Sequence, residues 1–305
     1  MARFFLFLFL MLPVVALSQA EAIPAMAIKE NIKKPVVKRS RLRPEQSFAI
    51  NTVIPEGSGL VAWNGKLWTH NDSGEPLLFA IDPVTGELQT TYVIPGVTNR
   101  DWEDLSDDEH YFYLGDIGNN RHKKDTLQIL RIEKRSLLEQ NPKVDAIAFV
   151  WPETWNRGKK EKINFDCEAM AVVNDSIYLF TKEWKKGRRI RMFTLPKVPG
   201  TYIAKYHATL KTNVLVTGAS YQTETKRLVL CGHNLILCSF LLVFEEGRAS
   251  DFFSGTVKKI KIRKSFRQTE GVSTFDGRAY YIINEDLRFL FLHTEQELHK
   301  LILEK

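Results

Sequence analysis

From residue 48 onward, apolar and polar residues alternate in short runs that are separated by tight turns. Alternation with a period of two predicts β-strands with one buried face. Three of the turns, Asn64-Gly65, Asn174-Asp175 and Asp276-Gly277, contain residues that tolerate positive φ, as hairpin turns require. Helical periodicity is nearly absent, and "RSLLEQN" (Arg135–Asn141) is the one fair helix candidate. The pattern therefore predicts an all-β protein.

The predicted strands form a repeated unit. Each copy has a small or acidic residue, an apolar strand, a tight turn and a second strand rich in aromatic residues and leucine. Four copies begin at Glu56, Asp101, Asp166 and Gln268, and a weaker fifth copy begins at Val216. Five four-stranded units with a period of roughly 45–65 residues predict a β-propeller with five blades. Six blades, with a degenerate blade within Lys197–Val214, is the alternative.

The N-terminal end of this region supplies a way to close the ring. "NTVIPEGSGL" resembles "TYVIPGVTNRDWEDL", where the same Val-Ile-Pro leads from an outer strand into the next unit. Phe48–Pro55 is therefore predicted to be an outer strand, while the last unit ends at "HKLILEK" without one. We expect the N-terminal strand to pair into the last blade, which removes an open sheet edge. Residues 45–305 then form a single propeller domain.

The first residues have the pattern of a secretory signal. "MARFFLFLFLMLPVVALSQA" has Arg3, an apolar core over residues 4–17, and then the small residues Ala16, Ser18 and Ala20. This order predicts a cleavable signal peptide at 1–20 and a secreted or periplasmic protein. The apolar core is shorter than the roughly 20 residues that span a bilayer, so we expect no transmembrane segment after cleavage. An uncleaved anchor is the alternative. Residues 21–44 are rich in Lys, Arg and Pro and predict a flexible basic lead-in.

The net charge of +7 and the pI near 9.2 raise the question of an anionic partner. The basic residues are scattered, except in Lys182–Arg191 and Lys258–Lys264, and no aromatic residues interleave them as in a nucleic-acid module. We therefore expect no nucleic-acid partner and interpret these two stretches as a solvated loop and a basic strand edge.

The cysteines do not indicate a disulfide framework. Cys167, Cys231 and Cys238 are odd in number and widely spaced, which predicts buried free thiols. A bond between Cys231 and Cys238 is the alternative if their strands are adjacent.

Aligning the units predicts which side chains meet at the hub. The first strand of each blade lines a propeller's channel, so equivalent positions form a ring, here Ser58, Glu103, Glu168, Thr217 and Glu270. A second ring, two residues earlier, holds Glu56, Asp101, Asp166 and Gln268.

The three glutamates Glu103, Glu168 and Glu270 are candidate metal ligands. At about 5–6 Å and an effective dielectric constant near 20, each pair of carboxylates would repel by about 3 kcal/mol. A cation relieves that repulsion, and hard oxygen ligands suit Ca²⁺ or Mg²⁺. The alternative is structural, because acids at such positions also accept hydrogen bonds from backbone amides of the neighbouring blade.

The second strands all end on polar residues that would emerge on one rim. The candidates for ligand binding there are Asn71, Asp72, Asp116, Asn119, Glu183, His233, Asn284 and Glu285. Propellers bind partners through such loops, although ordinary turns use the same residue types. A small molecule or an extracytoplasmic protein would be the partner of what we expect to be a monomer. The sequence has no Gly-rich phosphate loop, nucleophile elbow or zinc-protease motif, so it assigns no catalytic residue.

Several motifs also carry a family resemblance. "NGKLWTHNDSG", "LFAIDPVTGEL" and "DWEDLSDDEHYFYLGDIGNN", continued by "FDCEAMAV" and "TEGVS", resemble secreted β-propeller proteins common in Bacteroidota. The chain is more distantly similar to the periplasmic SdiA-regulated propellers and to NHL-like repeats. The resemblance covers most of Phe48–Ile302 and implies the fold and export, but little about activity.

Two functions follow as hypotheses. The first is an exported module that binds a ligand or partner at the rim, with Ca²⁺ or Mg²⁺ as a candidate ion on the channel axis. The alternative is a metal-dependent hydrolase of the lactonase or phosphoesterase type, with Asp72, Asp116, His233 or Glu285 as the base. Gluconolactonase-type propellers hold an axial ion with a Glu, two Asn and an Asp. Glu103, Glu168 and Glu270 match the acid position, whereas the asparagine pair has no match here.

Overall fold

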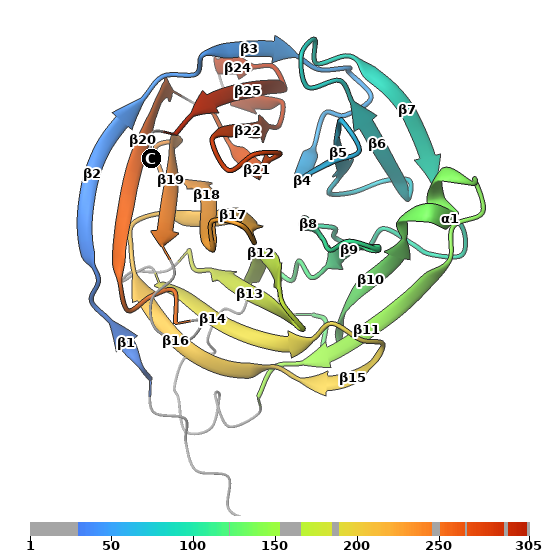
Figure 1. Cartoon of the computed structure of the whole chain (residues 1–305), viewed down its shortest axis with the longest axis horizontal. Helices are drawn as coiled ribbons and strands as arrows, with labels where there is room; N and C mark the ends of the chain where they lie inside the picture. The colour runs from blue at the N-terminus through green and yellow to red at the C-terminus, as the bar shows by residue number, and fades with distance from the viewer. Residues whose placement is uncertain are drawn as a thin grey trace, which may run out of the picture.

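The protein is a five-bladed β-propeller in a computed structural model (Figure 1). The structure describes residues 30–121, 123–152, 166–184, 189–245, 251–265, 267–289 and 292–303, so the predicted signal peptide at 1–20 lies outside the described residues. Five sheets surround a central axis, and the first strand of each blade faces that axis (Figure 1). Within the described residues, no helix has the length and apolar character needed to cross a membrane.

The blades follow one another along the chain. Blade 1 consists of β4 (Gly57–Trp63), β5 (Lys66–Asn71), β6 (Leu77–Ile81) and β7 (Leu88–Val93). Blade 2 consists of β8 (Asp104–Asp107), β9 (Tyr111–Asp116), β10 (Leu127–Glu133), β11 (Val144–Val150) and the added strand β15 (Gly200–Ile203), with the short helix α1 (Lys134–Leu138) after β10. Blade 3 consists of β12 (Asp166–Val173), β13 (Ser176–Lys182), β14 (Arg189–Pro196), β16 (Lys205–Lys211) and the added strand β1 (Ile32–Lys33).

Blade 4 consists of β17 (Leu215–Gln222), β18 (Arg227–His233), β19 (Cys238–Glu245), β20 (Thr256–Ser265) and the added strand β2 (Val36–Leu42). Blade 5 consists of β21 (Thr269–Thr274), β22 (Ala279–Asn284), β25 (Glu297–Ile302) and β3 (Gln46–Ala49). The hairpin of β23 (Leu287–Phe289) and β24 (Leu292–Thr294) projects from blade 5.

The ring closes as the sequence predicts. β3 pairs antiparallel with β25, with Phe48 opposite Leu298, so the N-terminal strand completes the last blade. The strand ends at Ala49 and not at Pro55, because residues 50–55 form the connection into blade 1. The six-blade alternative is wrong: residues 197–214 supply β15 and β16, which are outer strands of blades 2 and 3.

The expected flexible lead-in contains structure. Within residues 21–44, β1 pairs in parallel with β16 and β2 pairs in parallel with β20. Six of the seven residues of β2 are exposed, so this strand has no apolar alternation that the sequence could reveal. Backbone pairing to the outer edges of blades 3 and 4 orders the segment instead.

Large side chains fill the spaces between blades. Trp68 and Trp102 are 1% and 0% exposed, and the Trp68 ring lies 5.1 Å from that of Phe112 between blades 1 and 2.

Cys167 and Cys231 are buried, Cys238 is partly buried, and all three thiols are free.

Gly59 lets the inner strands of blades 1 and 2 approach closely. It has φ of +63°, and a Cβ there would lie 2.4 Å from the backbone nitrogen of Leu105. We expect Gly59→Ala to lower the free energy of unfolding by about 2–4 kcal/mol, measured by urea denaturation. Gly96 is the matched control, because its φ is +74° but a Cβ would meet nothing within 4 Å. Equal losses in the two variants would show that the close approach is unimportant.

Candidate functional site

β-Bulges place the predicted ring at the hub. The pairing of inner and second strands shifts register between Cys167 and Ala169, between Val216 and Gly218, and between Thr269 and Gly271. The extra residues at these three bulges are Glu168, Thr217 and Glu270. A bulge redirects the side chain of its extra residue, and it kinks the strand locally. In blades 3, 4 and 5 the recurrent small-or-acidic position in the sequence is therefore the bulge position of the inner strand.

The inner strands surround an acidic cavity of about 140 Å³, here called the hub cavity. Seven of its lining residues carry carboxyl groups: Glu56, Asp72, Asp101, Glu103, Glu168, Glu270 and Glu285. The others are Ser58, Asn120, Lys182, Trp184 and Gln268. The structure thus brings the three predicted glutamates together, and it adds three members of the second ring, Glu56, Asp101 and Gln268.

The two hydroxyl residues of the first ring connect blades. Ser58 Oγ donates a hydrogen bond to the carbonyl oxygen of Glu103, 2.6 Å away in blade 2. Thr217 Oγ1 donates to the carbonyl oxygen of Thr269 in blade 5. Thr217 is not among the residues that line the hub cavity. These two positions hold neighbouring blades together.

Asp104 accepts hydrogen bonds from backbone amides of other blades. This is the structural role that the sequence offers as an alternative for its neighbour Glu103. Asp104 Oδ2 accepts hydrogen bonds from the amides of Met170 (2.7 Å) and Ala219 (3.0 Å), which belong to blades 3 and 4. Its Oδ1 accepts from the amide of Leu105 at 2.9 Å. One fully buried carboxyl group therefore connects three blades. Burial raises its pKa well above the usual range despite these three donors.

Lys182 is the one cation among the described residues that line the hub cavity. Its ammonium group forms an ion pair with Glu168, and both side chains are 4% exposed. The same group lies 4.6 Å from the centre of the Trp184 ring. Burial lowers the pKa of Lys182, but the carboxylates of Glu168 and Glu270 outweigh burial and raise it overall. Lys182 is not among the site residues that the sequence predicts, although it ends its strand at the same place as Asn71 and His233.

Burial raises the pKa of several carboxyl groups that line the cavity. Burial, followed by neighbouring carboxylates, raises the pKa of Glu103 well above its normal range, and burial does the same for Glu168 and Glu270. Burial and then Glu56 raise the pKa of Asp72 to about 7. Burial and then Asp72 raise the pKa of Glu285 to about 7. The cavity thus holds more carboxyl groups than its single lysine can pair with.

Two buried acceptors face each other beside this cavity. Glu270 Oε1 and His233 Nε2 lie 4.0 Å apart, and neither has a hydrogen-bond partner among the described residues. His233 Nδ1 lies 3.1 Å from the carbonyl oxygen of Asn234, which assigns the ring proton to Nδ1 and leaves a lone pair on Nε2. Burial, followed by Lys182, lowers the pKa of His233 to about 4. Two unsatisfied acceptors at this separation call for a donor or a cation between them.

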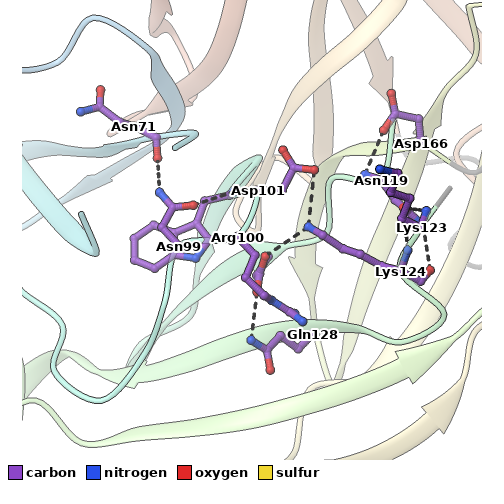
Figure 2. A network of polar contacts seen from close by, with 11 residues as sticks. Asn71, Asn99, Arg100, Asp101, Asn119, Lys123, Lys124, Gln128 and Asp166 are labelled. Carbon is purple, nitrogen blue, oxygen red and sulfur yellow. Dashed lines mark hydrogen bonds and ion pairs between the residues drawn. The ribbon is translucent and has the colours of Figure 1, made fainter. Parts of the chain in front are cut away.

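The predicted rim residues divide into two groups. Asp72 and Glu285 line the hub cavity. Asp116 is fully buried and accepts from Arg100 Nε at 2.6 Å and from Gln128 Nε2 at 2.9 Å. Asn119 closes its loop, because its side-chain oxygen accepts from the amides of Lys123 and Lys124 (Figure 2).

The remaining rim candidates also have partners within the chain. Asn71 Nδ2 donates to the carbonyl oxygen of Val53 at 3.0 Å, and Asn284 Nδ2 donates to that of Glu295 at 3.0 Å. Glu183 forms an ion pair with Arg191. These side chains shape the loops around the cavity and do not line it.

Asp72 and Glu285 should make stability fall as pH rises. Their pKa of about 7 in the folded protein exceeds the unfolded values near 4, so the folded state holds more protons between these limits. The free energy of unfolding then decreases from about pH 4 to about pH 7. We expect the melting temperature in EDTA to drop across this window, and Asp72→Asn with Glu285→Gln to reduce the drop. A steeper drop in the double variant would contradict this assignment.

No protein-family model matches the chain, and a search of curated proteins finds no match. Solved structures that match include an oxidoreductase of the glucose dehydrogenase type from Thermus thermophilus, with 11% identity and a TM-score of 0.49 over 84% of this chain and 99% of that chain. The WD40 repeats of RRP9 match with 8% identity and a TM-score of 0.45 over 86% and 99%. A chain of the mitotic checkpoint complex matches with 11% identity and a TM-score of 0.44 over 94% and 100%. The resemblance to Bacteroidota propellers stays a prediction.

Proposed function

We propose that this protein is an exported binding module whose hub cavity binds a hydrated divalent cation, Mg²⁺ or Ca²⁺. The observation that carries the proposal is the charge imbalance of the cavity, where seven carboxyl residues surround one ammonium group. The unpartnered acceptors Glu270 Oε1 and His233 Nε2 support it independently. Export rests on the signal-like residues 1–20.

The shape of the cavity favours an ion that keeps part of its water shell. Among the described residues, no three His, Cys, Asp or Glu side chains form a group able to hold a bare metal ion. A cavity of about 140 Å³ is well above the roughly 10–15 Å³ that one water molecule requires, so it has room for an ion with several waters. Mg²⁺ retains several waters in most protein sites, and those waters would donate hydrogen bonds to the surrounding carboxylates.

The cation would compete with protons for the same carboxyl groups. Asp72 and Glu285 are close to half-protonated at pH 7, since each has a pKa of about 7. Binding at that pH should therefore release about one proton from this pair, and affinity should rise with pH.

The test is calorimetric titration of MgCl₂ and CaCl₂ into chelator-treated full-length protein at pH 6 and pH 8. We expect tighter binding at pH 8, and a measured enthalpy that depends on the ionisation enthalpy of the buffer because protons are released. Absence of both binding heat and a shift in melting temperature at millimolar concentrations of either ion would refute the proposal.

A hydrolase is the second candidate, and one observation favours it. General acid–base catalysis is most effective when the pKa lies near the working pH, and Asp72 and Glu285 meet this condition beside the cavity. The other two candidate bases fit less well, because Arg100 pairs with Asp116 and the pKa of His233 is lowered to about 4. Hydrolysis of lactones or phosphomonoesters with added Mg²⁺, lost in Asp72→Asn while the cation still binds, would establish this function. No turnover on either class would leave the binding function alone.

A further inference from the structure

Two basic segments, β2 from the predicted lead-in and β20 with the stretch Lys258–Lys264, lie side by side on the outer edge of blade 4. Figure 1 shows β2 running along β20 at the rim of the ring. The two strands pair in parallel, in a register that places Arg39 opposite Lys259 and Arg41 opposite Lys261. The sequence alone predicts two separate features here, a flexible lead-in and a basic strand edge. Their pairing concentrates positive charge at one place.

Four of these cations share one face of the sheet. Side chains alternate between faces along a strand, so Arg39, Arg41, Lys259 and Lys261 point the same way. Together with Asn213 and Phe240 they line a groove of about 450 Å³, here called the basic groove.

The cations of the basic groove have no carboxylate partner in the part of the chain that the structure describes. Basic residues on the other face of β20 are paired, with Lys258 Nζ 3.0 Å from Glu245 and Lys264 Nζ 2.7 Å from Glu297. The paired and unpaired cations thus occupy opposite faces of one strand.

This arrangement is unfavourable in the isolated protein. Like charges directly opposite each other on neighbouring strands destabilise a sheet, by a few tenths to about 1 kcal/mol per pair. Lys259 is also partly buried, with its ammonium group 4.5 Å from the centre of the Phe240 ring and in contact with the Asn213 side chain. Burial, followed by Arg39, lowers the pKa of Lys259 to about 8. A bound anion would relieve both the repulsion and the shift in pKa.

We propose that the basic groove binds an acidic polysaccharide, a linear chain with repeated sulfate or carboxylate groups. Cations on one face of a strand recur every ~6.7 Å, and those on neighbouring strands lie ~4.8 Å apart, which forms a small grid suited to a polymer with regularly spaced charges. Single-stranded nucleic acid requires exposed aromatic rings on which bases stack. Phe240 is 8% exposed and lies beneath Lys259, so the groove offers no such ring. Charge alone, without stacking, favours the polysaccharide.

Heparin, a sulfated polysaccharide, is the probe that tests this site in the full-length protein. The test variant is Arg41→Gln with Lys261→Gln, and the matched control is Arg135→Gln with Lys143→Gln. The control removes the same charge near α1, on the opposite side of the ring (Figure 1), where the two side chains are 86% and 73% exposed. We expect the groove variant to bind heparin at least about tenfold more weakly, with a salt dependence reduced by about two charges. The control should bind as the wild type does.

Three outcomes would overturn the proposal. Equal weakening in both double variants would mean that heparin responds to net charge alone. Unchanged affinity in the groove variant would place heparin elsewhere. Tighter binding of a single-stranded DNA oligonucleotide than of heparin, also lost in the groove variant, would assign the groove to nucleic acid. Loss of folding does not confound the test, because removal of opposed charges should keep or raise the melting temperature at low salt. Arg39→Gln with Lys259→Gln provides a second groove variant.

Discussion

Replacing Asp104 with alanine should lower the free energy of unfolding by about 3–5 kcal/mol, the largest single-residue effect that we expect at the hub. The substitution removes the acceptor for three backbone amides, those of Leu105, Met170 and Ala219. Asp104 is 0% exposed, so water cannot easily replace the carboxyl oxygens. Each buried amide left without an acceptor costs about 1–3 kcal/mol, and partial relaxation keeps the sum below the maximum.

Urea denaturation followed by circular dichroism measures this effect. Asp145→Ala is the matched control, because its side chain is 51% exposed and pairs with Arg131 on the outer part of blade 2. A surface pair of this kind contributes about 0–1 kcal/mol, so the control should change little. A loss below about 1 kcal/mol in Asp104→Ala would mean that this carboxyl group does not hold the three blades together.

Removing charge from the hub cavity should weaken cation binding and stabilise the empty protein. Glu103→Gln with Glu270→Gln keeps the size of both side chains and removes two of the seven carboxyl groups. We expect divalent-cation affinity at pH 8 to fall at least about 100-fold, because two buried charges no longer attract the ion and its waters. We also expect a higher melting temperature in EDTA at pH 8, because repulsion among the remaining carboxylates is smaller.

Weaker cation binding together with a higher melting temperature distinguishes a cation site from a set of side chains that only holds the blades together. Glu75→Gln, an exposed residue outside the cavity lining, serves as the control and should alter neither quantity. If the three glutamates merely held the blades together, the double variant would melt at a lower temperature in EDTA. That result, together with unchanged cation affinity, would contradict the proposed site.

The fold could be predicted because each blade repeats both its alternation and its turn residues. Asn64 and Asn174 both adopt positive φ at the tips of their hairpins, as their residue types indicate. β1 and β2 could not be predicted in the same way. Their pairing with β16 and β20 joins segments far apart in the chain, and the exposed residues of β2 carry no period-two signal.

The hub could be predicted in part because the bulge position recurs in the alignment of the units. The sequence could not show that Glu103 lines the cavity while Asp104 accepts hydrogen bonds from other blades. Adjacent residues of a strand point in opposite directions, so an error of one position in the alignment exchanges the two roles. The ion pair of Lys182 with Glu168 could not be predicted for a related reason. Lys182 reaches Glu168 because β12 and β13 place it opposite Asp166, next to the bulge, and that register appears only in three dimensions.

A crystal of the full-length protein grown with MnCl₂ and measured at an anomalous wavelength would test the central proposal most directly. Mn²⁺ prefers oxygen ligands, as Mg²⁺ and Ca²⁺ do, and it scatters strongly enough to be located without ambiguity. We expect one anomalous peak inside the hub cavity, between Glu103, Glu168 and Glu270, that disappears in the Glu103→Gln, Glu270→Gln variant. A hub cavity that holds water alone, in crystals saturated with Mn²⁺, would contradict the proposal.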